Sequence, residues 1–172
     1  QKRICASLKG HFVTLGTNVI GARTVESVCT LYPNKFSRPL RAEFYGHKFT
    51  VLLDAPPASL DELLQLQSSK KEAILDHVRD LVQKFVDKGL LEFKYVHDLL
   101  WEYTKAVQDD AKRMEDLIQQ LADSAPKLIT TKPGARAICQ VITYSGAKDR
   151  KRVIKVCPLS LPAYFCYTYT GR

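Results

Sequence analysis

Apolar residues in the middle of the chain recur at spacings of three and four, the pattern of amphipathic helices. Three such stripes occupy residues 73–86, 93–107 and 111–121, and a fourth begins at Ala135 behind Gly134. Ser68 or Ser69 is the predicted N-cap of the first helix, with Glu72 three residues after Ser69 as a capping box, and Gly89 stands where that helix is expected to end. The middle of the chain therefore predicts consecutive helices.

The first third of the chain shows the same kind of pattern in shorter pieces. Apolar residues between Phe12 and Leu31, including Ile20, predict two short helices separated near residues 16–18, and residues 36–45 predict another. Consecutive prolines place a loop at residues 54–57. We therefore expect an all-α chain with short connections.

Similar segments recur along this helical pattern. Residues 21–29 and residues 134–142 both begin with Gly-Ala-Arg and carry apolar residues at matching places. Residues 96–101 show a similar spacing of apolar residues. Ala22 and Ala135 lie 113 positions apart, which corresponds to three intervals of about 38, with the second unit degraded. This period is typical of helical solenoids, in which each repeat buries its apolar face against its neighbours.

The charge of the chain indicates an anionic partner. Its 172 residues contain 26 Lys and Arg against 18 Asp and Glu, a net charge of +8, and nucleic acid or an anionic membrane surface are the usual partners of so basic a domain. The longest uncharged run, residues 156–171, is too short for a spanning helix and contains two prolines. We therefore expect no membrane association.

No motif for catalysis or metal binding stands out. The five cysteines include no Cys-x-x-Cys pair and the four histidines are scattered, so we expect no metal, no cofactor and no catalytic residue. The chain is predicted not to be an enzyme. It begins with Gln1 rather than Met, which favours a piece of a longer protein.

Four segments carry a resemblance to a known family: residues 7–11, 43–46, 134–136 and 148–151. Their order, together with the repeats, resembles the Pumilio (PUF) repeats of the divergent Puf-A-type nucleolar proteins, including their CPL (C-terminal Pumilio-like) domain. The resemblance covers residues 4–155 and implies a right-handed superhelix (α-solenoid) of armadillo-like helical repeats, here truncated. We assign residues 1–155 to this repeat region and residues 156–172 to a divergent tail that we expect to be poorly ordered.

The resemblance also implies a function. It predicts binding of RNA with little sequence preference, in large ribosomal subunit biogenesis, precursor rRNA processing and translation regulation. The implied partners are precursor rRNA, with mRNA or DNA as alternatives, and pre-ribosomal proteins, and the implied location is the nucleolus within the nucleus. The chain itself is expected to be a monomer.

Base recognition in such repeats uses two or three side chains of one helix. The aligned positions here do not form a usual base-reading set, which predicts non-specific binding. They are Ala22, Arg23 and Glu26 in one repeat, His97, Asp98 and Trp101 in the next, and Ala135, Arg136 and Cys139 in the last.

Positive side chains are the candidates for binding, because Lys and Arg that neutralise phosphates release counterions whatever the base sequence. The densest cluster lies at residues 148–155. A second cluster consists of Arg23, Lys35, Arg38 and Arg41. The predicted RNA-binding residues are Arg23, Arg38, Arg136, Lys148, Arg150, Lys151, Arg152 and Lys155.

Other interpretations of these residues stay open. Arg23 and Arg136 are equally compatible with a structural role, in which they pair with an acid or stack on a neighbour, and Trp101 and Tyr103 are expected to be core residues more often than base-stacking ones. The chain as a whole could instead be a scaffold whose charge attracts an acidic protein. The unusual tail leaves a third interpretation, a truncated product without a function.

Overall fold

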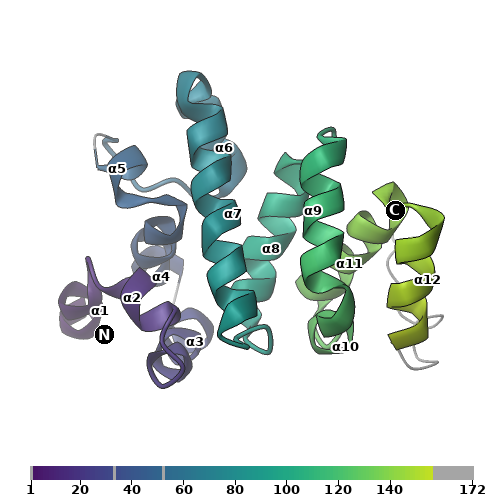
Figure 1. The fold of residues 1–172 in the computed structure, drawn as a ribbon. Helices are drawn as coiled ribbons and strands as arrows, with labels where there is room; N and C mark the ends of the chain where they lie inside the picture. Colours follow the sequence, from purple (N-terminus) through teal and green to yellow (C-terminus); the bar gives the residue numbers. More distant parts are fainter. Residues whose placement is uncertain (1, 33, 52, 157–172) are drawn as a thin grey trace. The chain divides into compact units, whose positions relative to one another are not determined.

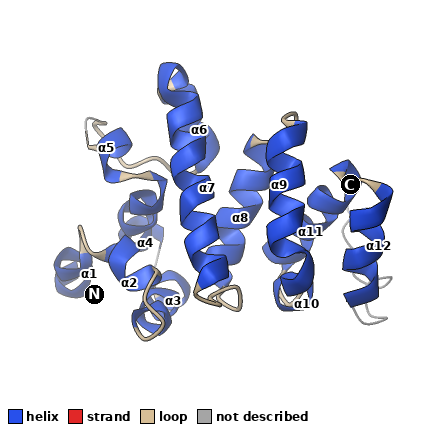
Figure 2. Ribbon diagram, viewed as in Figure 1, coloured by secondary structure: helices blue, strands red, loops and turns tan. Residues whose placement is uncertain are grey.

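The computed structural model describes residues 2–32, 34–51 and 53–156, and all regular structure in these ranges is helical (Figures 1 and 2). The chain divides between Tyr95 and Val96 into two compact units. The expectation of an all-α chain with short connections is confirmed for the described residues. The predicted tail lies outside them, except for Val156, which ends the last helix.

The first unit consists of short helices followed by one long helix. These are α1 (Lys2–Leu8), α2 (Phe12–Gly16), α3 (Gly21–Leu31), α4 (Asn34–Arg41), η1 (Ala42–Tyr45), α5 (His47–Thr50), α6 (Leu60–Leu66), η2 (Ser68–Lys70) and α7 (Lys71–Asp87). The two short helices predicted before residue 31 are α2 and α3, and the predicted loop at residues 54–57 is also present.

Aromatic residues from four segments form the centre of this unit. The Phe44 ring lies 5.4 Å from that of Phe12, 6.2 Å from that of Phe85 and 5.6 Å from that of Tyr95, measured between centroids. Next to this cluster, the buried carboxylate of Glu43 accepts hydrogen bonds from the backbone N–H groups of Gly10 at 2.7 Å and Phe12 at 3.1 Å. Glu43 thus satisfies the first N–H of α2, which has no partner within the helix, and a second N–H in the turn before it.

The ends of the helices show where local prediction succeeds and fails. Gly89, with φ +68°, ends α7, and the N–H of Leu90 bonds to the Phe85 carbonyl at 2.9 Å, as in a Schellman motif. The predicted cap at Ser68 or Ser69 is wrong, because both residues belong to the 3-10 turn η2 and α7 begins after it. Ile20, predicted on an apolar stripe, is 84% exposed because it precedes the first turn of α3.

The second unit begins within α8 (Lys94–Ala106). Its further described helices are α9 (Ala111–Leu121), η3 (Ala122–Ser124), α10 (Ala125–Leu128), α11 (Lys132–Tyr144) and α12 (Ala147–Val156). In Figure 1, α9 and α12 face the viewer and α8 and α11 lie behind them. Asp110 begins α9, since its side chain accepts a hydrogen bond from the Arg113 N–H at 3.1 Å, and this bond lowers the pKa of Asp110.

The shared Gly-Ala-Arg motif has a steric cause that the structure shows in each unit. A Cβ at Gly21 would lie 2.7 Å from the carbonyl oxygen of Leu15, and a Cβ at Gly134 would lie 2.1 Å from that of Leu128. Both carbonyls belong to the residue six positions earlier. Since neither glycine has a positive φ, glycine is required here for close approach of the preceding backbone and not for its conformational freedom.

The residue three positions before each of these glycines completes the motif. The Gly21 N–H donates to the Asn18 side chain at 3.0 Å, and the Gly134 N–H donates to the Thr131 hydroxyl at 3.2 Å. Thr131 also bonds to the buried His97 ring at 2.6 Å. The two Gly-Ala-Arg segments are therefore structurally equivalent helix starts, as expected for repeats.

The described residues lack two features of other protein classes. None of their helices combines the length and apolar character needed to cross a membrane. The described part of the chain also contains no group of three or more His, Cys, Asp or Glu side chains that could hold a metal ion.

Candidate nucleic-acid interface

Helix α12 presents lysines along one side of its surface. Val153 is its buried residue, and Asp149 is held towards α9 by a 3.1 Å hydrogen bond from Gln119. Lys148, Lys151 and Lys155 follow the i, i+3, i+7 spacing of a single helix face, on the side away from Val153, and all three are exposed. We call these three residues the α12 lysine stripe.

The two arginines of α12 do not belong to this stripe. Arg152 donates from Nε to Asp123 of η3 at 3.0 Å and forms an ion pair with the same carboxylate, and this partner raises the pKa of Arg152. Arg150 is exposed, but its register places it on the opposite flank of the helix from Lys148 and Lys155. The predicted cluster is thus divided into a stripe, a flanking arginine and a residue bound to an acid.

Arg136 lies on α11 and contacts an aromatic residue of α8. Its guanidinium carbon is 5.8 Å from the centroid of the Trp101 ring, and Lys105 Nζ is 5.5 Å from the same ring. Trp101 is only partly buried, whereas Tyr103 is 1% exposed. Stacking of Arg136 on a neighbour is confirmed, as is the core position of Tyr103, while Trp101 remains partly accessible.

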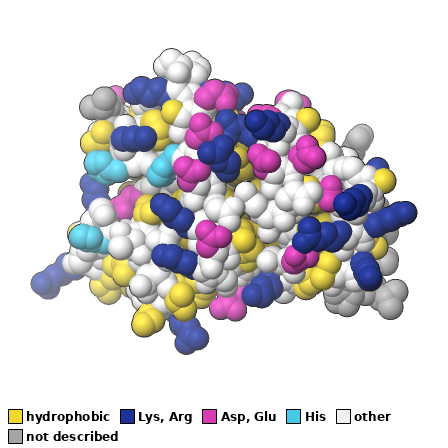
Figure 3. Space-filling view, viewed as in Figure 1, with side chains coloured by type: hydrophobic (Ala, Val, Ile, Leu, Met, Phe, Trp, Pro, Cys, Tyr) yellow, Lys and Arg dark blue, Asp and Glu magenta, His cyan; other side chains and the backbone are white. Residues whose placement is uncertain are grey.

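The exposed side of α8 carries both signs of charge. Asp98, Trp101, Glu102 and Lys105 share one face by their spacing, and the two acids are partly exposed. Figure 3 shows a related contrast on the face turned to the viewer, where Lys and Arg gather over α12 and alternate with Asp and Glu over α9. Among the described residues on this face, α12 therefore presents a more uniform positive surface than α9.

In the first unit, the predicted residues Arg23 and Arg38 have different surroundings. Arg23 is exposed on α3. Arg38, on α4, lies 3.4 Å from the Glu62 carboxylate, with both side chains a little over 40% exposed. An ion pair this accessible to water contributes little to stability, so Arg38 can exchange Glu62 for a stronger anionic partner.

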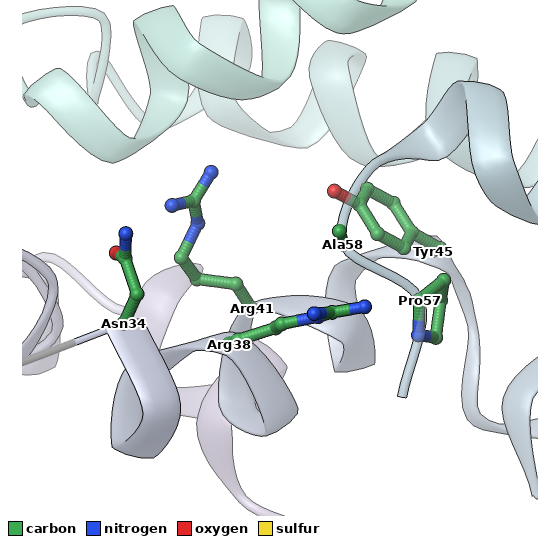
Figure 4. A pocket seen from close by; sticks show the side chains of 6 residues that line it. All are labelled: Asn34, Arg38, Arg41, Tyr45, Pro57 and Ala58. Atoms are coloured by element: carbon green, nitrogen blue, oxygen red, sulfur yellow. The ribbon is translucent and has the colours of Figure 1, made fainter. Parts of the chain in front are cut away.

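Arg38 also lines a pocket of about 190 Å³, which we call the α4 pocket (Figure 4). Asn34, Arg38 and Arg41 reach it from one face of α4, because they follow the i, i+4, i+7 spacing. The remaining lining residues are Tyr45, Pro57 and Ala58. Neither Arg23 nor Lys35 of the predicted second cluster lines this pocket, so the structure brings together only two residues of that cluster.

The sequence reasoning did not identify Asn34 and Tyr45 as residues of a site. The helical spacing of Asn34 from the two arginines was a usable signal. Tyr45 carried the same signal, because it follows Arg41 by four residues within the helix predicted over residues 36–45, and η1 carries its buried side chain to the pocket wall. The opposite wall depends on the chain returning at residues 57–58, a long-range feature that local patterns do not contain.

Comparison with known proteins places this geometry in a family context. No family model matches the chain. Pumilio domain-containing protein 12 of Caenorhabditis elegans is 27% identical over 153 residues, which is 88% of this chain and 20% of that protein. Pumilio homolog 24 of Arabidopsis thaliana is 27% identical over 154 residues, 87% of this chain and 24% of that protein. The chain thus spans about a fifth to a quarter of the length of these relatives.

Solved structures show the same fold. The crystal structure of human Puf-A matches with a TM-score of 0.78 and 24% identity, covering 89% of this chain and 30% of that chain. Human Puf-A in complex with DNA matches with the same TM-score and coverage at 23% identity. The predicted fold class, a helical solenoid of Pumilio-like repeats, is confirmed.

Proposed function

We propose that this chain, a homologue of Pumilio domain-containing proteins with the fold of human Puf-A, binds single-stranded nucleic acid through the sugar–phosphate backbone without sequence preference. The observation that carries the proposal is the α12 lysine stripe. Among the described residues, no acid forms an ion pair with Lys148, Lys151 or Lys155. Their ammonium groups are therefore available to phosphates.

The stripe has dimensions suited to a strand rather than to a single anion. A rise of 1.5 Å per residue separates Lys148 from Lys155 by about 10 Å along the helix axis. Lysine is a flexible point charge with three donors and imposes no base-specific geometry. Contacts of this kind release counterions and produce salt-sensitive binding of any sequence. The DNA complex of Puf-A supports nucleic acid as the ligand class.

Burial at the aligned base-reading positions supports the absence of a sequence code. Ala22 and His97 are fully buried and Ala135 is 3% exposed, so these side chains do not reach a base edge. Glu26 is occupied in another way, because its carboxylate accepts a hydrogen bond from the Tyr95 N–H at 3.1 Å. Arg136 is partly exposed, and its guanidinium group stacks on the Trp101 ring. In this position it can contact a phosphate or stack on a base, but it is poorly placed to read a base edge.

The cellular setting that we propose follows the family resemblance. RNA is the proposed nucleic acid, with precursor rRNA as the first candidate and assembly of the large ribosomal subunit in the nucleolus as the process. Pre-ribosomal proteins are the proposed neighbours, and the proposed role is binding without catalysis. The relatives with Pumilio domains and the basic charge of +8 support nucleic acid as the ligand class, whereas the process and the location follow from the resemblance alone.

Fluorescence anisotropy with two single-stranded RNAs of unrelated sequence tests the proposal. We expect the two affinities to agree within about threefold, which corresponds to less than about 0.7 kcal/mol of discrimination between the sequences. We also expect both affinities to fall steeply with added salt. An acidic peptide of the same length and charge serves as the competitor that represents the scaffold interpretation. Tight binding of the peptide together with no RNA binding at low salt overturns the proposal in favour of that interpretation.

A further inference from the structure

We infer that the α4 pocket is a binding site for one phosphoryl group of a nucleic-acid strand. This inference rests on the proposed function but concerns a different surface from the α12 lysine stripe. The stripe is an open row of lysines that holds a backbone at any position along it. The α4 pocket is a walled space with two guanidinium groups, and it predicts one localised contact of higher affinity.

The lining of the pocket has the chemistry of an anion site. Arg38 and Arg41 give it two positive charges, and its six lining residues include no acid, although the Glu62 carboxylate lies next to Arg38. Guanidinium groups present paired N–H donors whose geometry matches two oxygens of a phosphate. Asn34 adds an amide, and in Figure 4 the Tyr45 hydroxyl points into the space opposite Arg41. These groups converge from two sides on one volume.

Glu62 gives the pocket a built-in competitor for the anion. Its carboxylate lies 3.4 Å from Arg38 and also accepts a hydrogen bond from the backbone N–H of Ala58, which lines the pocket. The guanidinium group of Arg38 has five N–H donors, and its contact with Glu62 is a single long one. A phosphate group can therefore bind to Arg38 without first displacing a strong partner.

The size of the pocket is sufficient for the proposed group. A volume of about 190 Å³ equals about six times the share of one water molecule in the liquid, which is about 30 Å³. That space accepts a phosphoryl group together with part of its sugar or hydration shell. The buried Pro57 and Tyr45 close one side of it. The phosphoryl group can come from the end of a strand or from a phosphodiester within it.

The first experiment uses inorganic phosphate as the probe. In ¹⁵N spectra of the whole chain, the Nε–H signals of Arg38 and Arg41 are expected to shift on addition of sodium phosphate and not of sodium chloride at the same ionic strength. Arg23, which is exposed and outside the pocket, provides the internal reference. Equal shifts of Arg23 and the two pocket arginines would mean general ionic effects and would overturn the inference.

The second experiment uses a short oligouridylate with either a 5′-phosphate or a 5′-hydroxyl end. Arg38→Gln and Arg41→Gln are each expected to weaken binding about tenfold, the loss expected for one charge-assisted contact. Lys35→Gln is the matched control, since it removes the same charge from another face of α4, and it is expected to weaken binding by less than about threefold. A deficit confined to the 5′-phosphate strand identifies the strand end as the source, and an equal deficit with both strands identifies an internal phosphodiester.

Failure of the pocket and failure of the proposed function give different results. If the unmodified chain binds RNA and the two pocket variants behave as Lys35→Gln does, the pocket inference is wrong and the proposed function stands. If phosphate shifts the two pocket arginines but no RNA binds at low salt, the proposed function is wrong and the pocket is a site for a small phosphate. Both variants replace exposed or partly exposed side chains, so folding is checked by their unchanged circular dichroism.

Discussion

Replacement of Gly134 by alanine tests whether close backbone approach is the reason for the Gly-Ala-Arg motif. The new Cβ would lie 2.1 Å from the Leu128 carbonyl oxygen and 3.0 Å from Nδ1 of His97, which bonds to Thr131. A clash with backbone belongs at the upper end of overpacking costs, about 3 kcal/mol. Alanine regains about 1 kcal/mol through its helix propensity, which leaves a loss of about 2 kcal/mol in the free energy of unfolding.

The chain contains a convenient probe and a matched control for this measurement. Trp101 is its single tryptophan and lies beside Arg136 of α11, so its fluorescence during denaturation with guanidinium reports on the unit that contains Gly134. Gly146→Ala is the control, because its Cβ would meet nothing closer than Asp149 at 3.9 Å. We expect Gly146→Ala to change stability by less than about 0.5 kcal/mol. Equal midpoints for the two variants would refute the steric explanation.

Three further predictions concern other buried or capping groups. Burial, with a further contribution from nearby Lys48 and Lys84, lowers the pKa of His77 below 6.5. The unfolded chain therefore binds the proton more readily, and stability falls as the pH drops below about 6.5. In urea titrations, the loss of stability between pH 7 and pH 5 should be smaller for His77→Gln than for the unmodified chain. The hydrogen bond from the Arg113 N–H lowers the pKa of Asp110 below 3.8, so the stability that it contributes is present above that pH and is lost as the pH falls further. Asp110→Asn should flatten this acid limb of a thermal denaturation series, and an unchanged limb would contradict the assignment of the cap. The Tyr95 hydroxyl donates to the Gly16 carbonyl at 2.6 Å, so Tyr95→Phe should lower the free energy of unfolding by about 1–3 kcal/mol, and a variant as stable as the parent in urea would show that this bond is dispensable.

Much of the fold could be predicted because its signals are local. The break between α2 and α3, the end of α7 at Gly89 and the start of α9 at Asp110 all follow from short-range turn and capping chemistry. The equivalence of the two Gly-Ala-Arg segments also follows from sequence. Its cause does not, because the carbonyl that excludes a side chain at Gly134 becomes visible only when the preceding helix is in place.

The candidate site was predictable in charge but not in geometry. The excess of positive residues at 148–155 identified α12, yet only register on the folded helix separates Lys151 from Arg150, and only the packing of η3 shows that Arg152 is bound to Asp123. The α4 pocket depends on a return of the chain to Ala58, far from Arg38 in sequence. Patterns of composition therefore located the basic segments, whereas tertiary packing decided which side chains are available.

The salt dependence of RNA binding tests the central claim most directly. Each phosphate contact with a single strand contributes about 0.7 to the slope of log K against log salt concentration, so Lys148→Gln, Lys151→Gln and Lys155→Gln combined should reduce that slope by about 2. The reduction should be the same for RNAs of unrelated sequence. Lys112 and Lys127 are exposed on two other helices of the same unit. Replacing both by Gln is the control, and it should reduce the slope by less than the triple variant does. An unchanged slope in the triple variant, or a loss limited to one RNA sequence, would contradict backbone binding by α12.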